Sequence, residues 1–175
     1  MHKVLAAAFT VAAMVAPGIA SSQMPKAVEA AFPDAKQVGE ATFSFLFWDV
    51  FSGTLWSEDG EFDWDSPFAL SLTYFTDFSA AELTDQTIEE LDRLTDWSEA
   101  TLAAFKATVA PCMADVSSGD RFTAVSAEPD QVRLYLNGRE TCTFEWPAAR
   151  RSYFRIWLDD DSRFPERSRQ LKGQS

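Results

Sequence analysis

Residues 38–56 read VGEATFSFLFWDVFSGTLW, and residues 68–75 read FALSLTYF. Both stretches are rich in aromatic and β-branched side chains and have no interior proline, a composition that favours β-strands. From Phe68 to Tyr74 large apolar residues alternate with Ala, Ser and Thr, which is typical of a half-buried strand. Gly53 indicates a bend or the close approach of another segment. The two stretches predict the first strands of a sheet.

Helices are predicted after these strands. Ser79 and Glu82 have the spacing of a capping box, in which each side chain bonds the backbone of the other residue. The helix that begins there carries its apolar residues mostly on one side, and Glu90 and its charged neighbours are expected to face water. Ser98 is likewise placed to cap the start of a second helix, which is predicted to end at Pro111.

The last third of the chain returns to strand patterns and then to helices. Residues 120–127 and 132–136 have strand composition, and the Asn-Gly pair at 137–138 is a type I′ hairpin signal. Pro147 suits the first turn of another helix, and a short helix is expected at 166–172. Strands, helices, strands and helices in this order predict an α+β domain with an antiparallel sheet.

The amino terminus has the pattern of a secretory signal peptide. Residues 1–20 combine a basic start, an apolar core and small residues before the expected cleavage site. Residues 21–37 are small, polar and interrupted by prolines, so we interpret them as a lead-in segment to one domain at 38–172. No later segment approaches the ~20 apolar residues of a spanning helix. We expect an exported protein, periplasmic or secreted after cleavage, without a transmembrane segment.

Charge and rare residues argue against several functions. The net charge of −12 repels nucleic acid and anionic lipid headgroups. The single histidine, His2, lies in the signal peptide, so histidine-dependent hydrolysis and histidine-ligated metals are not expected. An EF-hand loop starting at Asp59 would need glycine at its sixth position and glutamate at its twelfth, where this chain has Trp64 and Leu70. We predict no nucleic-acid partner, no metal site and no cofactor.

Cys112 and Cys142 are the two cysteines of the chain. An even number of cysteines in an exported protein favours pairing, whereas a redox-active pair would more often be C-x-x-C. We predict a structural disulfide.

Several motifs, in their order and spacing, resemble the bacterial chalcone isomerase-like family. They are FWDVF at 47–51, FALSLTY at 68–74, GDRF at 119–122, LYLNG at 134–138, and IWLD at 156–159 followed by Pro165. The resemblance spans residues 38–172. It implies an open-faced β-sandwich, in which helices cover a long antiparallel sheet and leave a cleft between the layers. In plant relatives that cleft binds a chalcone or a fatty acid.

The polar residues of the catalytic relatives are replaced in this chain. Their first-strand arginine is missing, since no arginine precedes Arg93. Asp49 falls near their strand threonine, Leu83 near their tyrosine and Glu90 near their asparagine. An oxyanion needs cationic or neutral donors, and an aspartate would oppose it. The fatty-acid-binding relatives use an arginine and a tyrosine to bind the ligand carboxylate, so these positions do not support fatty-acid binding in this chain either. No catalytic residue is therefore assigned.

Four residues are candidates for ligand binding in the expected cleft. They are Asp49, Ser71, Tyr74 and Arg151. Alternation places Asp49 on the same side of its strand as Phe47 and Phe51, where a carboxylate would have a raised pKa. Such an acid either serves a site or is held by backbone donors or a distant cation. We predict that it faces the cleft and pairs with one of three arginines: Arg150, Arg151 or Arg155.

Three functions are compatible with these observations. The leading hypothesis is an exported, non-catalytic protein that binds a small apolar or amphipathic, fatty-acid-like molecule between sheet and helices. The second is an acid–base isomerase of unknown substrate that uses Asp49. The third is a protein-interaction module with an exposed aromatic patch, such as one around Trp56 and Trp64.

Overall fold

The computed structural model describes residues 23–174, and the predicted signal peptide at 1–20 lies outside the described residues. Six strands form one sheet in the order β1-β2-β3-β4-β5-β6, and each is antiparallel to its neighbours. The strands are β1 (Lys36–Phe45), β2 (Trp48–Ser57), β3 (Phe68–Tyr74), β4 (Arg121–Ser126), β5 (Gln131–Leu136) and β6 (Arg139–Glu145). The sheet is thus a meander, and its antiparallel pairing agrees with the prediction.

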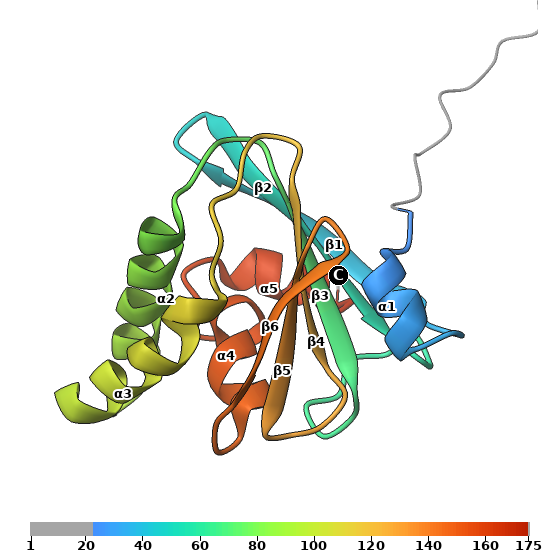
Figure 1. The fold of residues 1–175 in the computed structure, drawn as a ribbon. Helices are drawn as coiled ribbons and strands as arrows, with labels where there is room; N and C mark the ends of the chain where they lie inside the picture. Colours follow the sequence, from blue (N-terminus) through green and yellow to red (C-terminus); the bar gives the residue numbers. More distant parts are fainter. Residues whose placement is uncertain (1–22, 175) are drawn as a thin grey trace, which may run out of the picture.

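Helices lie on both faces of the sheet (Figure 1). They are α1 (Lys26–Ala31), α2 (Ala80–Leu94), α3 (Glu99–Val109), the 3₁₀-helix η1 (Ala110–Cys112), α4 (Ala149–Leu158) and α5 (Pro165–Leu171). Helices α2 and α3 are inserted between β3 and β4, yet those strands still pair directly. Between residues 23 and 174, no helix has the length and apolarity needed to cross a membrane. The predicted α+β architecture with an antiparallel sheet is confirmed.

The two faces of β3 bury different cores. Phe68, Leu70, Leu72 and Tyr74 belong to the larger core beneath α2, α3, α4 and α5. Ala69 belongs to a smaller core beneath α1. Because side chains alternate along a strand, successive residues of β3 point into the larger and the smaller core in turn.

Helix α1 lies within the segment predicted to be a lead-in. Its Val28 and the following Phe32 are buried with Trp56 in the smaller core. The segment therefore contributes to the domain. Trp56 is only 4% exposed, so the prediction of an exposed patch around it was wrong. Trp64 is half-buried and packs against the larger core.

Local signals account for several element ends. Ser79 and Glu82 form the predicted capping box, with Ser79 N–H donating to Glu82 Oε2 at 2.8 Å. Ser98 caps α3 by accepting from the Thr101 N–H at 3.2 Å. Asn137 and Gly138 both have positive φ, 51° and 80°, as the hairpin turn between β5 and β6 requires.

A disulfide joins Cys112 of η1 to Cys142 of β6, with the two Cα atoms 5.1 Å apart. It ties the end of the helical insertion to β6, an edge strand of the sheet. The predicted pairing is confirmed.

The β1–β2 hairpin departs from simple alternation near its tip. Phe43 pairs with Phe51 but Ser44 pairs with Asp49, so Val50 is an extra residue in β2. Relative to Phe51, such a bulge reverses the side to which the residues between Val50 and the hairpin tip point. The tip itself carries four consecutive exposed apolar residues: Phe45 at 67%, Leu46 at 74%, Phe47 at 93% and Trp48 at 72%.

Candidate ligand cavity

A cavity of about 400 Å³ lies between the sheet and the helical layer. Strands β1 to β4 form one wall, and α2, α4 and the segment before α5 form the other. Nine aromatic residues line it: Phe43, Phe45, Phe51, Tyr74, Phe78, Phe122, Tyr153, Trp157 and Phe164. Ligand pockets in proteins have this size and this apolar character.

Aromatic contacts hold the cavity wall in place. Phe43 stacks on Phe51 with ring centroids 4.6 Å apart and meets Phe164 edge-on at 5.7 Å. Tyr74 lies 5.8 Å from Phe51 and 5.9 Å from Phe78. Aromatic pairs at these distances stabilise a fixed arrangement beyond the area they bury. The cavity therefore has walls of defined shape.

One face of α2 contributes residues at helical spacing. Leu83, Gln86, Thr87 and Glu90 all line the cavity, which is the i, i+3, i+4, i+7 pattern of a helix face. Glu90 is only 8% exposed, so the prediction that it faces water was wrong. The same spacing was the signal that could have placed it inside.

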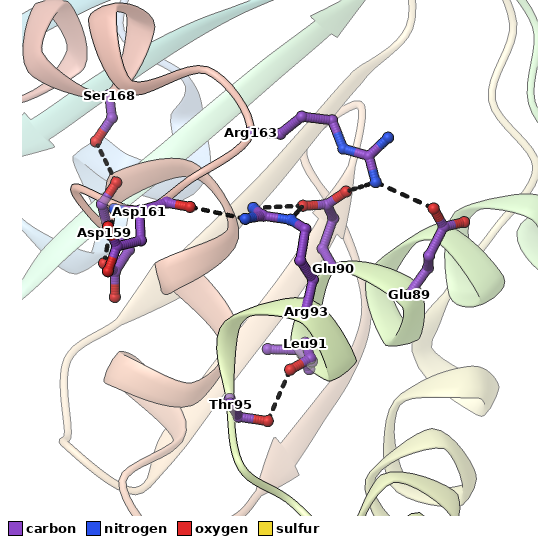
Figure 2. A network of polar contacts seen from close by, with 9 residues as sticks. All are labelled: Glu89, Glu90, Leu91, Arg93, Thr95, Asp159, Asp161, Arg163 and Ser168. Atoms are coloured by element: carbon purple, nitrogen blue, oxygen red, sulfur yellow. Dashed lines mark hydrogen bonds and ion pairs between the residues drawn. The ribbon is translucent and has the colours of Figure 1, made fainter.

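Arginines neutralise the buried carboxylate of Glu90 (Figure 2). Its Oε2 accepts from Arg93 at 2.9 Å, and its Oε1 lies 2.5 Å from Arg163 Nη2. Arg163 also donates to Glu89 Oε1 at 3.0 Å. The hydrogen bond to Glu89 and the charge of Glu90 raise the pKa of Arg163 above its ordinary value. This cluster of four residues ties α2 to the segment before α5.

Two tyrosines add hydroxyl groups to the cavity. Tyr74 of β3 and Tyr153 of α4 line it and are 5% and 4% exposed. Burial raises the pKa of both phenols above the ordinary range, because an ionised phenolate would lose its hydration. Both therefore remain neutral hydroxyl groups at physiological pH.

Of the four predicted ligand-binding residues, Tyr74 lines the cavity. Ser71 points to the face that bears Ala69 and shares a 3.0 Å hydrogen bond with Thr123. Arg151 places its guanidinium 4.8 Å from the centroid of the Trp64 ring. Neither Ser71 nor Arg151 is among the cavity residues.

Asp49 lies on the exposed part of the β1–β2 hairpin. Its Oδ1 accepts from Ser44 Oγ at 2.6 Å. The prediction of a buried Asp49 paired with an arginine was wrong, because the bulge at Val50 reverses the alternation on which it rested.

The three arginines proposed as partners of Asp49 have other contacts. Arg150 is buried and donates to Ser126 Oγ at 3.0 Å and to the carbonyl oxygens of Ser126 and Ala127. Desolvation lowers the pKa of its guanidinium. Arg155 forms a 3.2 Å ion pair with Asp159, one helical turn away.

Comparison with known proteins identifies the fold. No family model matches the chain, and no curated protein matches its sequence. Among solved structures, a fatty-acid binding protein of Arabidopsis thaliana superposes with a TM-score of 0.61 at 8% sequence identity. The match covers 80% of this chain and 87% of that one. Together with the meander and its helical layer, this similarity shows that the chain has the chalcone isomerase-like fold.

Proposed function

We propose that this protein is a non-catalytic member of the bacterial chalcone isomerase-like family and binds a small apolar or amphipathic molecule in the cavity between sheet and helices. The observation that carries the proposal is the cavity of about 400 Å³ with a mainly aromatic and aliphatic wall. The plant protein of the same fold is described as fatty-acid binding, which supports a ligand of similar character.

The positions of the polar residues favour binding over catalysis. Glu90 is the carboxylate among the cavity residues, and it is already neutralised by Arg93 and Arg163. A general acid or base must instead exchange a proton with the substrate. Asp49, the candidate for an isomerase, is exposed and bonded to Ser44. The isomerase hypothesis therefore loses its catalytic group.

A hydrocarbon fluorophore tests the binding function directly. Diphenylhexatriene fluoresces in apolar surroundings and has no polar group, so we expect saturable fluorescence with the purified protein. Leu83→Trp should fill part of the cavity and weaken binding about tenfold or more, a change of about 1.4 kcal/mol. Leu136→Trp is the matched control, since Leu136 is also partly buried but does not line the cavity. Equal affinity of both variants and the wild type would show that the fluorophore binds elsewhere.

A second candidate function is supported by the exposed hairpin tip at residues 45–48. Four consecutive exposed apolar side chains are unusual on a monomer and are typical of a surface that contacts another protein. We expect Phe47→Ser combined with Trp48→Ser to abolish any dimer or complex while leaving diphenylhexatriene binding intact. Sedimentation velocity and native mass spectrometry measure the first effect. A wild-type protein that remains a monomer at high concentration and binds no other protein counts against an interaction function of the hairpin tip.

We further propose that the protein is exported. The composition of residues 1–20 and the disulfide between Cys112 and Cys142 support this location. Intact mass of protein recovered from the periplasm or the medium should show the loss of residues 1–20 and one disulfide. Retention of the whole chain in the cytoplasm would contradict export.

A further inference from the structure

The polar side chains that line the cavity differ in whether they have partners. Five are already bonded within the protein: Ser44 to Asp49, Gln86 to Glu89, Thr87 to the Leu83 carbonyl, and Glu90 and Arg163 to each other. The hydroxyls of Tyr74 and Tyr153 form no hydrogen bond with any residue from 23 to 174. Neither hydroxyl is among the fully enclosed side-chain atoms of residues 23–174 that lack a partner, so each is accessible from the cavity, where water or a ligand can bond it.

Aromatic contacts hold each of the two tyrosines in place. Tyr153 meets Phe154 and Trp157 edge-on, with both centroid distances 5.4 Å, and Tyr74 is fixed by Phe51 and Phe78. Tyr74 of β3 and Tyr153 of α4 both line this cavity. Donors held in fixed positions bind an acceptor at little cost in conformational entropy.

The charges around the cavity disfavour an anionic ligand. Arg163 is the cation among the cavity residues of the described chain, and it already contacts Glu89 and Glu90. A ligand carboxylate would have to displace Glu90, whose side chain is only 10% exposed. An uncharged ligand avoids both the displacement and the loss of hydration of its own charge.

We propose that Tyr74 and Tyr153 form a recognition site for an oxygen acceptor on an uncharged apolar ligand, with a ketone carbonyl as the best-fitting group. This inference rests on the proposed binding function and narrows its ligand class. A carbonyl oxygen has two lone pairs and can accept from both hydroxyls. The indole N–H of Trp157, half-buried beside Tyr153, is a further donor without a protein partner among residues 23–174.

Competition against bound diphenylhexatriene tests the site. The competitors are 2-undecanone, which is neutral, and decanoate, which is anionic at pH 8. We expect 2-undecanone to displace the fluorophore at a concentration at least about threefold lower than decanoate. Tyr74→Phe and Tyr153→Phe should each lower the affinity for 2-undecanone roughly three- to tenfold, which corresponds to the loss of one hydrogen bond. Neither substitution should change the affinity for diphenylhexatriene.

The third tyrosine provides a matched control. Tyr135 packs against the smaller core beneath α1, on the other side of the sheet. Tyr135→Phe should therefore leave the affinity for 2-undecanone unchanged. Equal competition by the ketone in the wild type and in both cavity variants would overturn the inference, as would tighter binding of decanoate. Failure of the wild type to bind diphenylhexatriene would instead overturn the binding function on which the inference rests.

A spectroscopic measurement on the wild type does not depend on the variants folding. The carbonyl stretch of ¹³C-labelled 2-undecanone should shift to lower frequency in the protein than in hexane, because hydrogen bonds weaken the C=O bond. Tyr→Phe variants that fold should show a smaller shift. A bound ketone with the frequency it has in hexane would refute the tyrosine site.

Discussion

Replacing Gly39 with alanine is expected to lower the free energy of unfolding by about 3 kcal/mol, the upper part of the usual range for overpacking. A Cβ atom at Gly39 would overlap the carbonyl oxygen of Gln170 and lie 2.6 Å from that of Leu171. Both groups are backbone at the end of α5, so no side-chain rotation can relieve the contact. Helix α5 must move away from β1.

This movement should also affect the cavity. Arg163 and Phe164 line the cavity and lead directly into α5 at Pro165. Displacement of α5 should therefore weaken both the Arg163–Glu90 pair and binding of diphenylhexatriene. Urea unfolding and fluorescence titration of Gly39→Ala measure the two effects.

Gly53→Ala on the adjacent strand is the matched control for Gly39→Ala. The nearest atoms to its new Cβ would be the side-chain ends of Leu171 and Leu72, both at 3.3 Å, and the Phe43 ring at 3.5 Å. Because those ends can shift by a few tenths of an ångström, we expect a cost below about 1 kcal/mol. Similar destabilisation by both substitutions would contradict the proposed role of backbone contact at Gly39.

Removing the disulfide by Cys112→Ala with Cys142→Ala is expected to cost about 3 to 4 kcal/mol. The bond closes a loop between residues 30 positions apart, and opening it gives the unfolded chain more conformations. Cys112 is also 2% exposed within the larger core, so the loss of its sulfur removes packing. The folded state should lose the covalent link between η1 and β6.

Urea unfolding of the oxidised wild type and of the double variant measures this difference. The control is wild-type protein unfolded in the presence of a reducing agent. Its free energy of unfolding should differ from that of the double variant only by the packing contribution of the cysteine sulfur atoms. A difference below about 1 kcal/mol would show that the unfolded state is already compact around these residues.

Residues governed by their immediate neighbours were predictable from the sequence. The Ser79–Glu82 capping box and the Asn137-Gly138 turn depend on backbone groups within three residues, and both are present. The alternation from Phe68 to Tyr74 correctly placed the large apolar residues on one face of β3, but the strand is buried on both faces and not half-buried as predicted. The pairing of Cys112 with Cys142 followed from an even count and the expected compartment.

Positions that depend on distant groups were not predictable in this way. Asp49 was assigned to the cleft by a strict period of two, but pairing with β1 leaves Val50 as an extra residue. Arg150 was one of three candidate partners of Asp49, whereas its guanidinium donates to carbonyl oxygens at 126 and 127, more than twenty residues earlier in the sequence.

Apart from α1, the sequence by itself indicated which segments form strands and helices, where two helices begin and that the two cysteines pair, because each depends on local geometry or on composition. Only the tertiary structure decided which polar groups line the cavity. Glu90 can be buried because Arg163, 73 residues later, lies beside it. Tyr74 and Tyr153 become a pair because the sheet and α4 enclose one space. Burial of a polar group depends on the partners that folding brings to it, and local periodicity contains no information about those partners.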